Sequence, residues 1–525
     1  MRLFGNLLTK NARKKVVLVV LDGLGVAPPG PGNAVTLANT PNLDKYWQNY
    51  PHGTLKAFGK FVGLPQDADG NSEVGHLTMG AGKVVLQDLP RIDNAIQTGS
   101  FFKNDQFLKA IEHAKNNAGA IHLLGLVGNG LVHSDLNHLF ALIDLLDQQS
   151  FDPDKVSLHA FLDGRDSSPD AGARVLERID KYMDSKRLGK IASFVGRAFA
   201  KDRDERWDRT KKAYEIITLG KGKKVGNYKV ALEKYYKRGK SDEYIEPHVI
   251  VGVNRDKNTV SRGDSVISFD FRPDRAVQLT KAFVQEDFQG FDRKRIEDLY
   301  FVGMTEYAEG IPENVAFPSE QISRTLGQVL SINKKSQLRI AESEKFPHVT
   351  FFFDGENNLV YEGVDQVEVP SNRKVTTYDQ MPEMRSVEIA DNYIKFDNKK
   401  DYDFALINFA APDMVAHTGN LQASIKAIET VDRELGRVVD HAQKKGAIVL
   451  LTSDHGNCEE LINTRTGEVD TKHSSNDVPL IAIGKGLKKR EFEYGSLVDV
   501  APIVLAHLGI EKPIEMEGQD LLSAL

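Results

Sequence analysis

The residues best suited to chemistry are aspartates and histidines that follow apolar runs of the chain. Asp413 and His417 are four residues apart, so on a helix both side chains would face one point. Asp22 stands directly after the first long apolar run, and three further members lie towards the C-terminus: Asp454, His455 and His473. Mixed carboxylate and imidazole ligands suit Mn²⁺, Zn²⁺ or a similar ion, and two such ions about 4 Å apart form a clamp for phosphoryl transfer.

Taken singly, these residues also have ordinary explanations. An aspartate before a glycine at the end of a strand, such as Asp22, is commonly a turn residue. The metal hypothesis therefore depends on the coincidence of several such residues at strand ends.

Ser72 is a candidate nucleophile in the segment Asp69-Gly-Asn-Ser-Glu-Val-Gly-His76, where a helix could begin. The free N–H groups of a helix start favour a bound phosphate. A metal ion at the hydroxyl would lower its pKa and make it a nucleophile at neutral pH. The alternative is a simple helix N-cap, a common role of Ser or Asn.

Arginines between these blocks suggest a site for a small, doubly anionic molecule, because guanidinium groups bind phosphate and carboxylate bidentately. The alternative is surface ion pairing, for example of Arg272 or Arg275 with Asp270 or Asp274. The members of this group are His133, Arg165, Asp166, Arg197, Arg203, Arg272 and Arg275.

The elements that must position these residues are strands and helices in alternation. Unbroken apolar runs, typical of parallel strands buried on both faces, occupy residues 16–21, 121–127, 156–162, 191–195, 265–271, 404–409 and 447–451. Apolar residues three or four apart predict a helix from Ile425 to Ala442 that stops at Gly446, and another over 498–508 closed by Gly509. The sequence therefore predicts an α/β fold, in which ligands bind at the carboxyl ends of strands.

Composition is that of a soluble globular protein: 525 residues, 41% apolar and 27% charged, enough for about three to four domain units. The net charge of −6 does not suggest a nucleic-acid binder. Residues 181–240 nevertheless hold 19 Lys or Arg against 7 Asp or Glu, which indicates either an anion-attracting surface or a solvated lysine-rich helix and loop. With one cysteine and no apolar run of about 18 residues, we expect a cytoplasmic protein that does not span a membrane.

Several nucleotide and zinc motifs are absent from the sequence. Residues 75–83 lack the Gly-Lys-Ser/Thr ending of a phosphate loop, and there is no complete Gly-x-Gly-x-x-Gly fingerprint. There is also no His-Glu-x-x-His and no cysteine pair for zinc. These absences argue against an ATP-driven kinase and a nicotinamide dehydrogenase.

The order and spacing of the motifs resemble the cofactor-independent (2,3-bisphosphoglycerate-independent) phosphoglycerate mutases of the alkaline phosphatase superfamily, nearly from end to end. The matching pieces are Leu21-Asp-Gly-Leu-Gly25, Asn71-Ser-Glu-Val-Gly-His76, Asp163-Gly-Arg-Asp166, Asp202-Arg-Asp204, Arg206-Trp207, Phe271-Arg-Pro-Asp-Arg-Ala276, Arg339-Ile-Ala-Glu342, Glu344-Lys345, Pro412-Asp-Met-Val415, His417-Thr-Gly419 and Asp454-His-Gly-Asn457.

The resemblance implies an α/β, phosphatase-like metal domain over residues 1–86 and 320–525, with a second, glycerate-binding α/β domain inserted at 87–319. It implies one metal ion on Asp413, His417 and His473, and another on Asp22, Ser72, Asp454 and His455. Ser72 would carry the phosphoryl group, and Lys345 would face it.

In the inserted domain, the resemblance assigns the glycerate to His133, Arg165, Asp166, Arg197, Arg203, Arg272 and Arg275. The implied reaction interconverts 3-phosphoglycerate and 2-phosphoglycerate through phosphoserine, with Asp166 as general acid/base at the glycerate hydroxyls. Closure of the domains would exclude water, since water reaching the phosphoserine would make the enzyme a phosphatase.

The implied cofactors are two divalent ions, Mn²⁺ first and Zn²⁺ or Co²⁺ as alternatives, with no 2,3-bisphosphoglycerate. The implied partner is the small-molecule substrate alone, without nucleic acid or membrane, and the implied state is a monomer. Because histidine ligands must be neutral, activity should fall below about pH 6.5. The rival hypotheses are a metal-dependent phosphatase or other phosphomutase of the superfamily, and a non-catalytic, metal-stabilised scaffold.

Some positions depart from the family pattern. The loop before His133 lacks the usual Ser-Asp-Gly-Gly, and Asp354-Gly-Glu356 replaces Asn-Gly-Gly. Asp477 stands where proline is usual. Lys201 stands where methionine is common, and we expect it to add positive charge beside Arg203.

Overall fold

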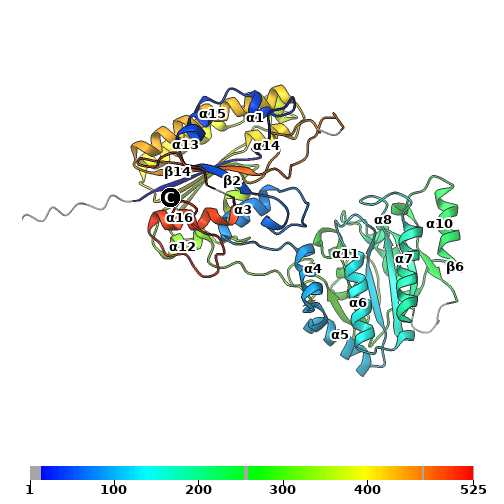
Figure 1. Cartoon of the computed structure of the whole chain (residues 1–525). Helices are drawn as coiled ribbons and strands as arrows, with labels where there is room; N and C mark the ends of the chain where they lie inside the picture. The colour runs from blue at the N-terminus through cyan, green and yellow to red at the C-terminus, as the bar shows by residue number, and fades with distance from the viewer. Residues whose placement is uncertain (1–13, 253–257, 464–465, 493, 524–525) are drawn as a thin grey trace, which may run out of the picture. The chain divides into compact units, whose positions relative to one another are not determined.

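The computed structural model describes residues 14–252, 258–463, 466–492 and 494–523, which form two compact units. The first unit comprises the chain up to Leu86 together with Gln321–Leu525, and the second comprises Gln87–Glu320 (Figure 1). The second unit thus spans residues 87–320, where the resemblance implied an inserted domain over 87–319.

The first unit is built on an eight-stranded sheet in the order β12-β11-β13-β1-β14-β15-β2-β16. The strands β12, β11, β13, β1 and β14 run parallel to one another, and β15 is antiparallel to both of its neighbours. The strands, in sheet order, are Val364–Val369, Gln337–Glu342, Phe404–Phe409, Val16–Leu21, Ile448–Thr452, Val478–Ile483, His52–Lys56 and Gly495–Ser496.

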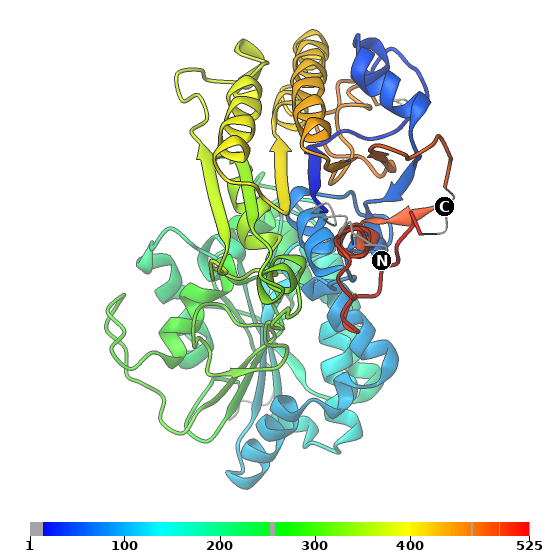
Figure 2. The ribbon, with the colours of Figure 1, turned by 90° about the vertical axis from the view of Figure 1, so that its left-hand side faces the viewer.

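Helices cover both faces of this sheet. Figure 1 shows α1, α13 and α15 on one face and α3, α12 and α16 on the other, and Figure 2 shows the long orange helix α15 running alongside the strands. The helices of this unit are α1 (Ala34–Leu37), α2 (Pro41–Asn49), α3 (Ser72–Ala81), α12 (Leu326–Ile332), α13 (Ser386–Lys399), α14 (Ala411–Ala416), α15 (Leu421–Lys444) and α16 (Val500–Leu508).

The two-sided cover explains why β1 reads as an unbroken apolar run. Val17, Val19 and Leu21 pack in the core that includes α15, and Val16, Leu18 and Val20 pack in the core that includes α3 and α16. Side chains alternate between the faces of a strand, so a strand covered on both sides needs apolar residues at every position. The predicted strands and helices of this unit are therefore confirmed, with α15 and α16 ending just before Gly446 and Gly509.

The second unit holds another eight-stranded sheet, in the order β10-β9-β8-β3-β4-β5-β7-β6. Only β7 pairs antiparallel, with β5, among the strands described. The strands, in sheet order, are Asn314–Val315, Tyr300–Gly303, Ser265–Ser268, Ile121–Val127, Val156–Leu162, Lys190–Gly196, His248–Ile250 and Lys223–Val225.

Helices again pack on this sheet. It has separate apolar cores, and the residues of β3 and β4 are divided between these cores. The predicted strand at 265–271 is shorter than expected, since β8 ends at Ser268. The helices are α4 (Asp88–Thr98), α5 (Asp105–Asn116), α6 (Leu136–Gln148), α7 (Gly172–Lys186), α8 (Arg197–Ala200), α9 (Trp207–Leu219), α10 (Tyr228–Tyr236) and α11 (Pro273–Val284).

Parallel strands bring the chemistry-bearing residues of each unit to one edge of its sheet. In the first unit β13, β1 and β14 are adjacent, and the segments after them carry Asp413, Asp22 and Asp454. Within the described part of the chain, no helix has the length and apolar character needed to cross a membrane.

Candidate active site

Ser72 is the first residue of α3, and the helix cap is its neighbour. The side chain of Asn71 accepts a hydrogen bond from Val74 N at 3.1 Å, which is the capping interaction. The alternative role of Ser72 as an N-cap is therefore wrong. Because Asn71 fulfils that role, the Ser72 hydroxyl is free to face the aspartates and histidines at the sheet edge.

The Ser72 hydroxyl lies among three polar groups of the first unit. Its Oγ is 2.6 Å from Lys345 Nζ, 2.9 Å from His455 Nε2 and 3.3 Å from Asp22 Oδ1. Only 6% of the residue is exposed. Segments far apart in the chain thus converge on one hydroxyl.

Lys345 is the cation of this site. It lies in the turn after β11 and pairs with Asp22 Oδ1 and Asp413 Oδ2, each at 2.6 Å. Burial alone would lower the pKa of Lys345, but these two carboxylates raise it above its ordinary value. The Lys345 ammonium therefore stays charged.

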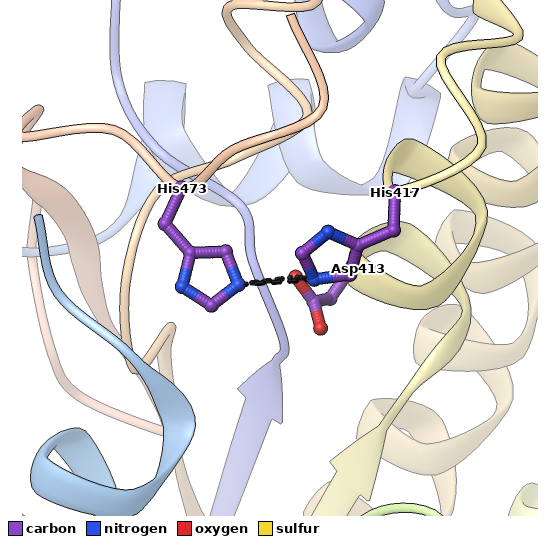
Figure 3. Close-up of side chains that lie close together, drawn as sticks. All are labelled: Asp413, His417 and His473. Carbon is purple, nitrogen blue, oxygen red and sulfur yellow. Dashed lines mark hydrogen bonds and ion pairs between the residues drawn. The ribbon is translucent and has the colours of Figure 1, made fainter. Parts of the chain in front are cut away.

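Asp413, His417 and His473 form a compact trio (Figure 3). The two imidazole Nε2 atoms are 3.0 Å apart, and Asp413 Oδ1 lies 3.3 Å from that of His417 and 3.4 Å from that of His473. Asp413 and His417 reach one point because α14 places them one turn apart, with His417 as its C-cap residue.

The trio fits a metal ion through the state of its imidazoles. His417 Nδ1 faces Thr471 O at 2.9 Å and His473 Nδ1 faces Gly70 O at 2.8 Å, so each Nδ1 donates to a carbonyl. In the neutral rings the two Nε2 lone pairs then point at each other and at a carboxylate. A cation would satisfy all three acceptors, and carbonyl-bound Nδ1–H groups are the usual support of histidine ligands.

A second set of ligand atoms lies beside the first. Asp22, Asp413 and His455 come within mutual reach, as do Asp22, His76 and Asp454. Asp454 is fully buried, and its Oδ2 makes no hydrogen bond, although it lies 3.3 Å from His76 Nδ1 and 3.7 Å from His455 Nε2. An anionic oxygen held in this way also fits a bound cation.

The charges of this site are strongly coupled. Burial alone would raise the pKa of Asp413 and of Asp454, but Lys345 and the histidines hold both well below the ordinary value. Burial would likewise lower the pKa of His455, but Asp454, Asp22 and Asp413 raise it to about 9. Asp413 also raises the pKa of His417. Asp413 and Asp454 are thus ionised, and His455 holds a proton that a metal ion would displace.

In the second unit, Arg197 is the centre of the predicted glycerate group. Its guanidinium Nη1 donates to Asp163 and Asp166, and Nη2 lies 3.1 Å from His133 Nε2. Burial, together with the cations Lys201 and Arg197, lowers the pKa of His133 to about 4, so this imidazole is neutral.

Asp274 joins two further arginines to the same region. Arg272 Nε is 3.1 Å from Asp274 Oδ1 and Arg203 Nη1 is 3.2 Å from Oδ2, while His133 Nδ1 lies 3.6 Å from Oδ1. The ion pair of Arg272 with Asp274, considered as an alternative from the sequence, is therefore present. It coexists with the cluster, because both arginines remain about half exposed.

The last two arginines lie at the margin of this cluster. Arg275 donates to Lys201 O at 3.0 Å, and burial followed by the charges of Arg197, Arg203 and Arg165 lowers the pKa of its guanidinium. The side chain of Arg165 is 56% exposed and lies 3.9 Å from Glu243. The structure thus gathers His133, Asp166, Arg197, Arg203, Arg272 and Arg275, with Arg165 near enough to repel Arg275.

Lys201, which stands where the family commonly has methionine, is buried and paired with a carboxylate. The residue is 2% exposed and forms an ion pair with Asp270, which is itself fully buried. Burial lowers the pKa of Lys201 despite this partner. Lys201 therefore forms a buried ion pair beside the cluster, and its added positive charge beside Arg203 stays a prediction.

The lysine-rich stretch contains many ordinary surface ion pairs. Lys181 and Lys229 both pair with Glu177 at 3.0 Å, and Lys223 pairs with Glu246 at 2.9 Å. These contacts match the solvated helix and loop that the sequence offered as the simpler reading.

Sequence reasoning missed several polar side chains that support the first-unit site. Asn408 donates to Asp22 Oδ2 at 2.7 Å and lies 3.2 Å from His76 Nε2. Asn457 donates to Asp413 Oδ1 at 2.8 Å. The signal for Asn408 was available, since it is a polar residue inside the apolar run that forms β13.

Comparisons with known proteins agree with this division of the chain. A family model described as "BPG-independent PGAM N-terminus" matches residues 92–309, and one described as "Sulfatase" matches residues 348–510. The fold, its two sheets and the sulfatase match define a protein of the alkaline phosphatase superfamily, as predicted.

Full-length relatives narrow the assignment. A 2,3-bisphosphoglycerate-independent phosphoglycerate mutase of Clostridium novyi is 46% identical over 97% of this chain and 99% of its own length, and one of Moorella thermoacetica is 45% identical over 97% and 98%. A crystal structure of Leishmania mexicana phosphoglycerate mutase at low cobalt concentration has a TM-score of 0.64 and 30% identity, covering 97% of each chain. The chain belongs to the 2,3-bisphosphoglycerate-independent phosphoglycerate mutase family, whose activity is that of an isomerase.

Proposed function

We propose that this protein interconverts 3-phosphoglycerate and 2-phosphoglycerate through a phosphoserine at Ser72. The observation that carries the proposal is the position of the Ser72 hydroxyl, within 3.3 Å of Lys345, His455 and Asp22 at the start of α3. Family membership supplies the substrate class.

Two divalent ions would be held by the first unit, one by Asp413, His417 and His473 and the other by Asp22, Ser72, Asp454 and His455. When bound, such ions lower the pKa of a serine hydroxyl and offset charge on the phosphoryl oxygens. Mn²⁺ suits the oxygen and imidazole donors, and Zn²⁺ or Co²⁺ are alternatives.

The chain's own groups would then divide the phosphoryl transfer. Ser72, ionised at its hydroxyl, attacks phosphorus through Oγ, and the bond to the glycerate oxygen breaks as Asp166 gives that oxygen a proton. Asp166 then takes the proton of the 2-hydroxyl as this oxygen attacks the phosphoserine, which forms 2-phosphoglycerate and returns Ser72 to its ionised state. Lys345, kept protonated by its two carboxylate partners, balances the negative charge of the transferring group. The first N–H groups of α3 face the same phosphoryl, because Ser72 opens the helix.

The second unit would hold the glycerate while it turns. Arg197, Arg203, Arg272 and Arg275, with Arg165, supply guanidinium forks for the carboxylate and phosphate. Asp166 would take and return the proton of the glycerate hydroxyls. Its Oδ2 is fixed by Arg197 Nη1, so the acceptor is already oriented. His133 stays neutral and contributes a hydrogen bond without charge.

We further propose a cytoplasmic monomer that needs no 2,3-bisphosphoglycerate. The names of the curated relatives state this independence for those proteins.

A phosphorus NMR time course tests the proposed function. The protein receives 3-phosphoglycerate and Mn²⁺ without 2,3-bisphosphoglycerate, and we expect a 2-phosphoglycerate signal that Ser72→Ala abolishes. Free phosphate as the sole product would overturn the mutase and favour a phosphatase. A Ser72→Ala variant with undiminished turnover would reject Ser72 as the nucleophile.

A further inference from the structure

Glu459 is a buried carboxylate of the first unit that lies outside the proposed ligand set. It is 3% exposed and accepts four hydrogen bonds. Oε2 accepts from Gly25 N at 2.9 Å and from Asn457 N at 2.8 Å, and Oε1 accepts from Asn476 Nδ2 at 2.9 Å and from the Ser474 hydroxyl. In the described part of the chain, no lysine, arginine or histidine forms an ion pair with it.

The four donors belong to the three loops that carry the proposed ligands. Gly25 is three residues after Asp22, Asn457 is two residues after His455, and Ser474 directly follows His473. Two backbone bonds link these loops in pairs, Cys458 N to Gly23 O at 3.0 Å and Ser474 N to Gly456 O at 2.9 Å. The Glu459 carboxylate joins all three at one point.

The backbone is shaped to let this carboxylate in. At Gly25 an added Cβ would overlap the Glu459 carboxyl group, and at Gly456 it would overlap both Glu459 Oε1 and Ser474 Oγ. Any side chain at either position would push the carboxylate away from the loops. The arrangement therefore depends on glycine at both places.

The loop that Glu459 holds also reaches the remaining ligand-bearing helix. Asn457, whose N–H donates to Glu459 Oε2, donates its own Nδ2 to Asp413 Oδ1 at 2.8 Å. The position of Asp413 is thus tied to Glu459 through one intervening residue.

We infer that Glu459 is a positioning residue that fixes the three ligand-bearing loops in the geometry that binds the divalent ions. A carboxylate is required because all four of its contacts are donors, and an ionised carboxylate has only acceptor positions to offer. The inference rests on the proposed ligand assignment and extends it to a group that contacts neither substrate nor metal.

The test is Glu459→Gln, which keeps the shape of the side chain. In one orientation its amide NH₂ faces the Gly25 and Asn457 N–H groups, which can only donate. In the other it faces the Ser474 hydroxyl and the Asn476 amide, which can accept only by giving up the hydrogen bonds that they now donate. We expect the Kd for Mn²⁺, measured by electron paramagnetic resonance on metal-free full-length protein, to rise about 10- to 100-fold. Circular dichroism measures the amount of folded protein before each titration.

Asp432→Asn is the matched control. Asp432 is also buried and accepts backbone N–H groups, from Asn42 at 3.1 Å and Leu43 at 2.7 Å, but it has no hydrogen bond to a ligand-bearing loop. We expect its Mn²⁺ Kd to stay within about twofold of the parent even if its melting temperature falls by as much as that of Glu459→Gln. A purely structural role for Glu459 would make the two variants alike.

Asp413→Asn separates this inference from the ligand assignment. If Asp413→Asn leaves Mn²⁺ binding unchanged, the ligand assignment fails. If Asp413→Asn weakens binding but folded Glu459→Gln stays within twofold of the parent, the positioning role is overturned. Should Glu459→Gln not fold, Ser474→Ala removes one donor, and a Kd raised at least threefold supports the inference whereas an unchanged Kd contradicts it.

Discussion

The two units carry opposite kinds of polar site on similar, mostly parallel sheets. In the first, one lysine faces several buried carboxylates, so the site is built to receive cations. In the second, arginines outnumber their acidic partners and several remain about half exposed, so the site is open to an anion. The edge of each sheet thus provides a place for a site, and the residues at the strand ends decide whether that site attracts cations or anions.

The contrast extends to the histidines. His455 lies among carboxylates, which raise its pKa to about 9, whereas burial and the cations around His133 lower its pKa to about 4. The imidazole of His455 is therefore protonated, with a proton that a metal ion could displace, whereas the imidazole of His133 is neutral.

The largest expected effect comes from the first unit. Ser72→Ala removes the proposed nucleophile, and we expect kcat to fall by about 10⁴- to 10⁶-fold, as for other nucleophile deletions. Phosphorus NMR measures the rate, and mass spectrometry of quenched protein should lose the phosphorylated peptide that contains residue 72. A phosphopeptide that persists in the variant would place the intermediate elsewhere.

Arg197→Ala tests the second unit alone. Arg197 holds Asp163, Asp166 and His133 together, so its loss should lower kcat/KM for 3-phosphoglycerate by about 10²- to 10³-fold. Mn²⁺ affinity should stay at the parent value, because the proposed metal ligands belong to the other unit. Weakened Mn²⁺ binding would contradict the separation of the two sites.

Lys201→Met tests the buried pair of the second unit. It leaves Asp270 buried without a cation, which should lower the free energy of unfolding by about 3–5 kcal/mol. Adding Asp270→Asn should restore most of the loss. Urea unfolding of both variants measures the effect, and a double variant no more stable than the single one would show that the pair does not act as a unit.

The smallest expected effect is that of one pH unit on Mn²⁺ binding. His455 must lose its proton to become a ligand, so affinity should fall by about tenfold for each pH unit below about 9. The ordinary imidazole pKa of about 6.5 predicts a loss only at lower pH, whereas the carboxylates around His455 raise its pKa and so move the loss of Mn²⁺ affinity to higher pH. Binding of 3-phosphoglycerate to metal-free protein should not follow the same profile, since His133 stays neutral throughout. Affinity for Mn²⁺ that is flat from pH 9 to 7 would contradict the ligand role of His455.

Much of the fold could be read from the chain because its physical signals are local. A strand such as β1 must be apolar at every position when both faces are covered, and α15 shows its buried stripe at helical spacing. The polar residues that end such strands were therefore found as candidates.

Other features depend on contacts that no local pattern encodes. Whether Asn71 or Ser72 caps α3 is decided by which side chain reaches Val74 N, a choice between adjacent residues that both cap well. The pairing of Lys201 with a buried Asp270 could not be predicted, because the two residues are 69 positions apart in the chain. The role of Glu459 arises from three loops meeting in space, and its sequence neighbours give no sign of it.

Because the side chains of β1 alternate between two cores, the length of this strand fixes where Asp22 lies at the edge of the sheet. Each residue advances the strand by about 3.3 Å and reverses the face of the side chain. One inserted residue between Val16 and Leu21 would exchange the contents of the two cores or displace Asp22 by that length. The length of this apolar strand therefore sets the position of Asp22, and we expect insertions to be tolerated better in the loops outside the strand.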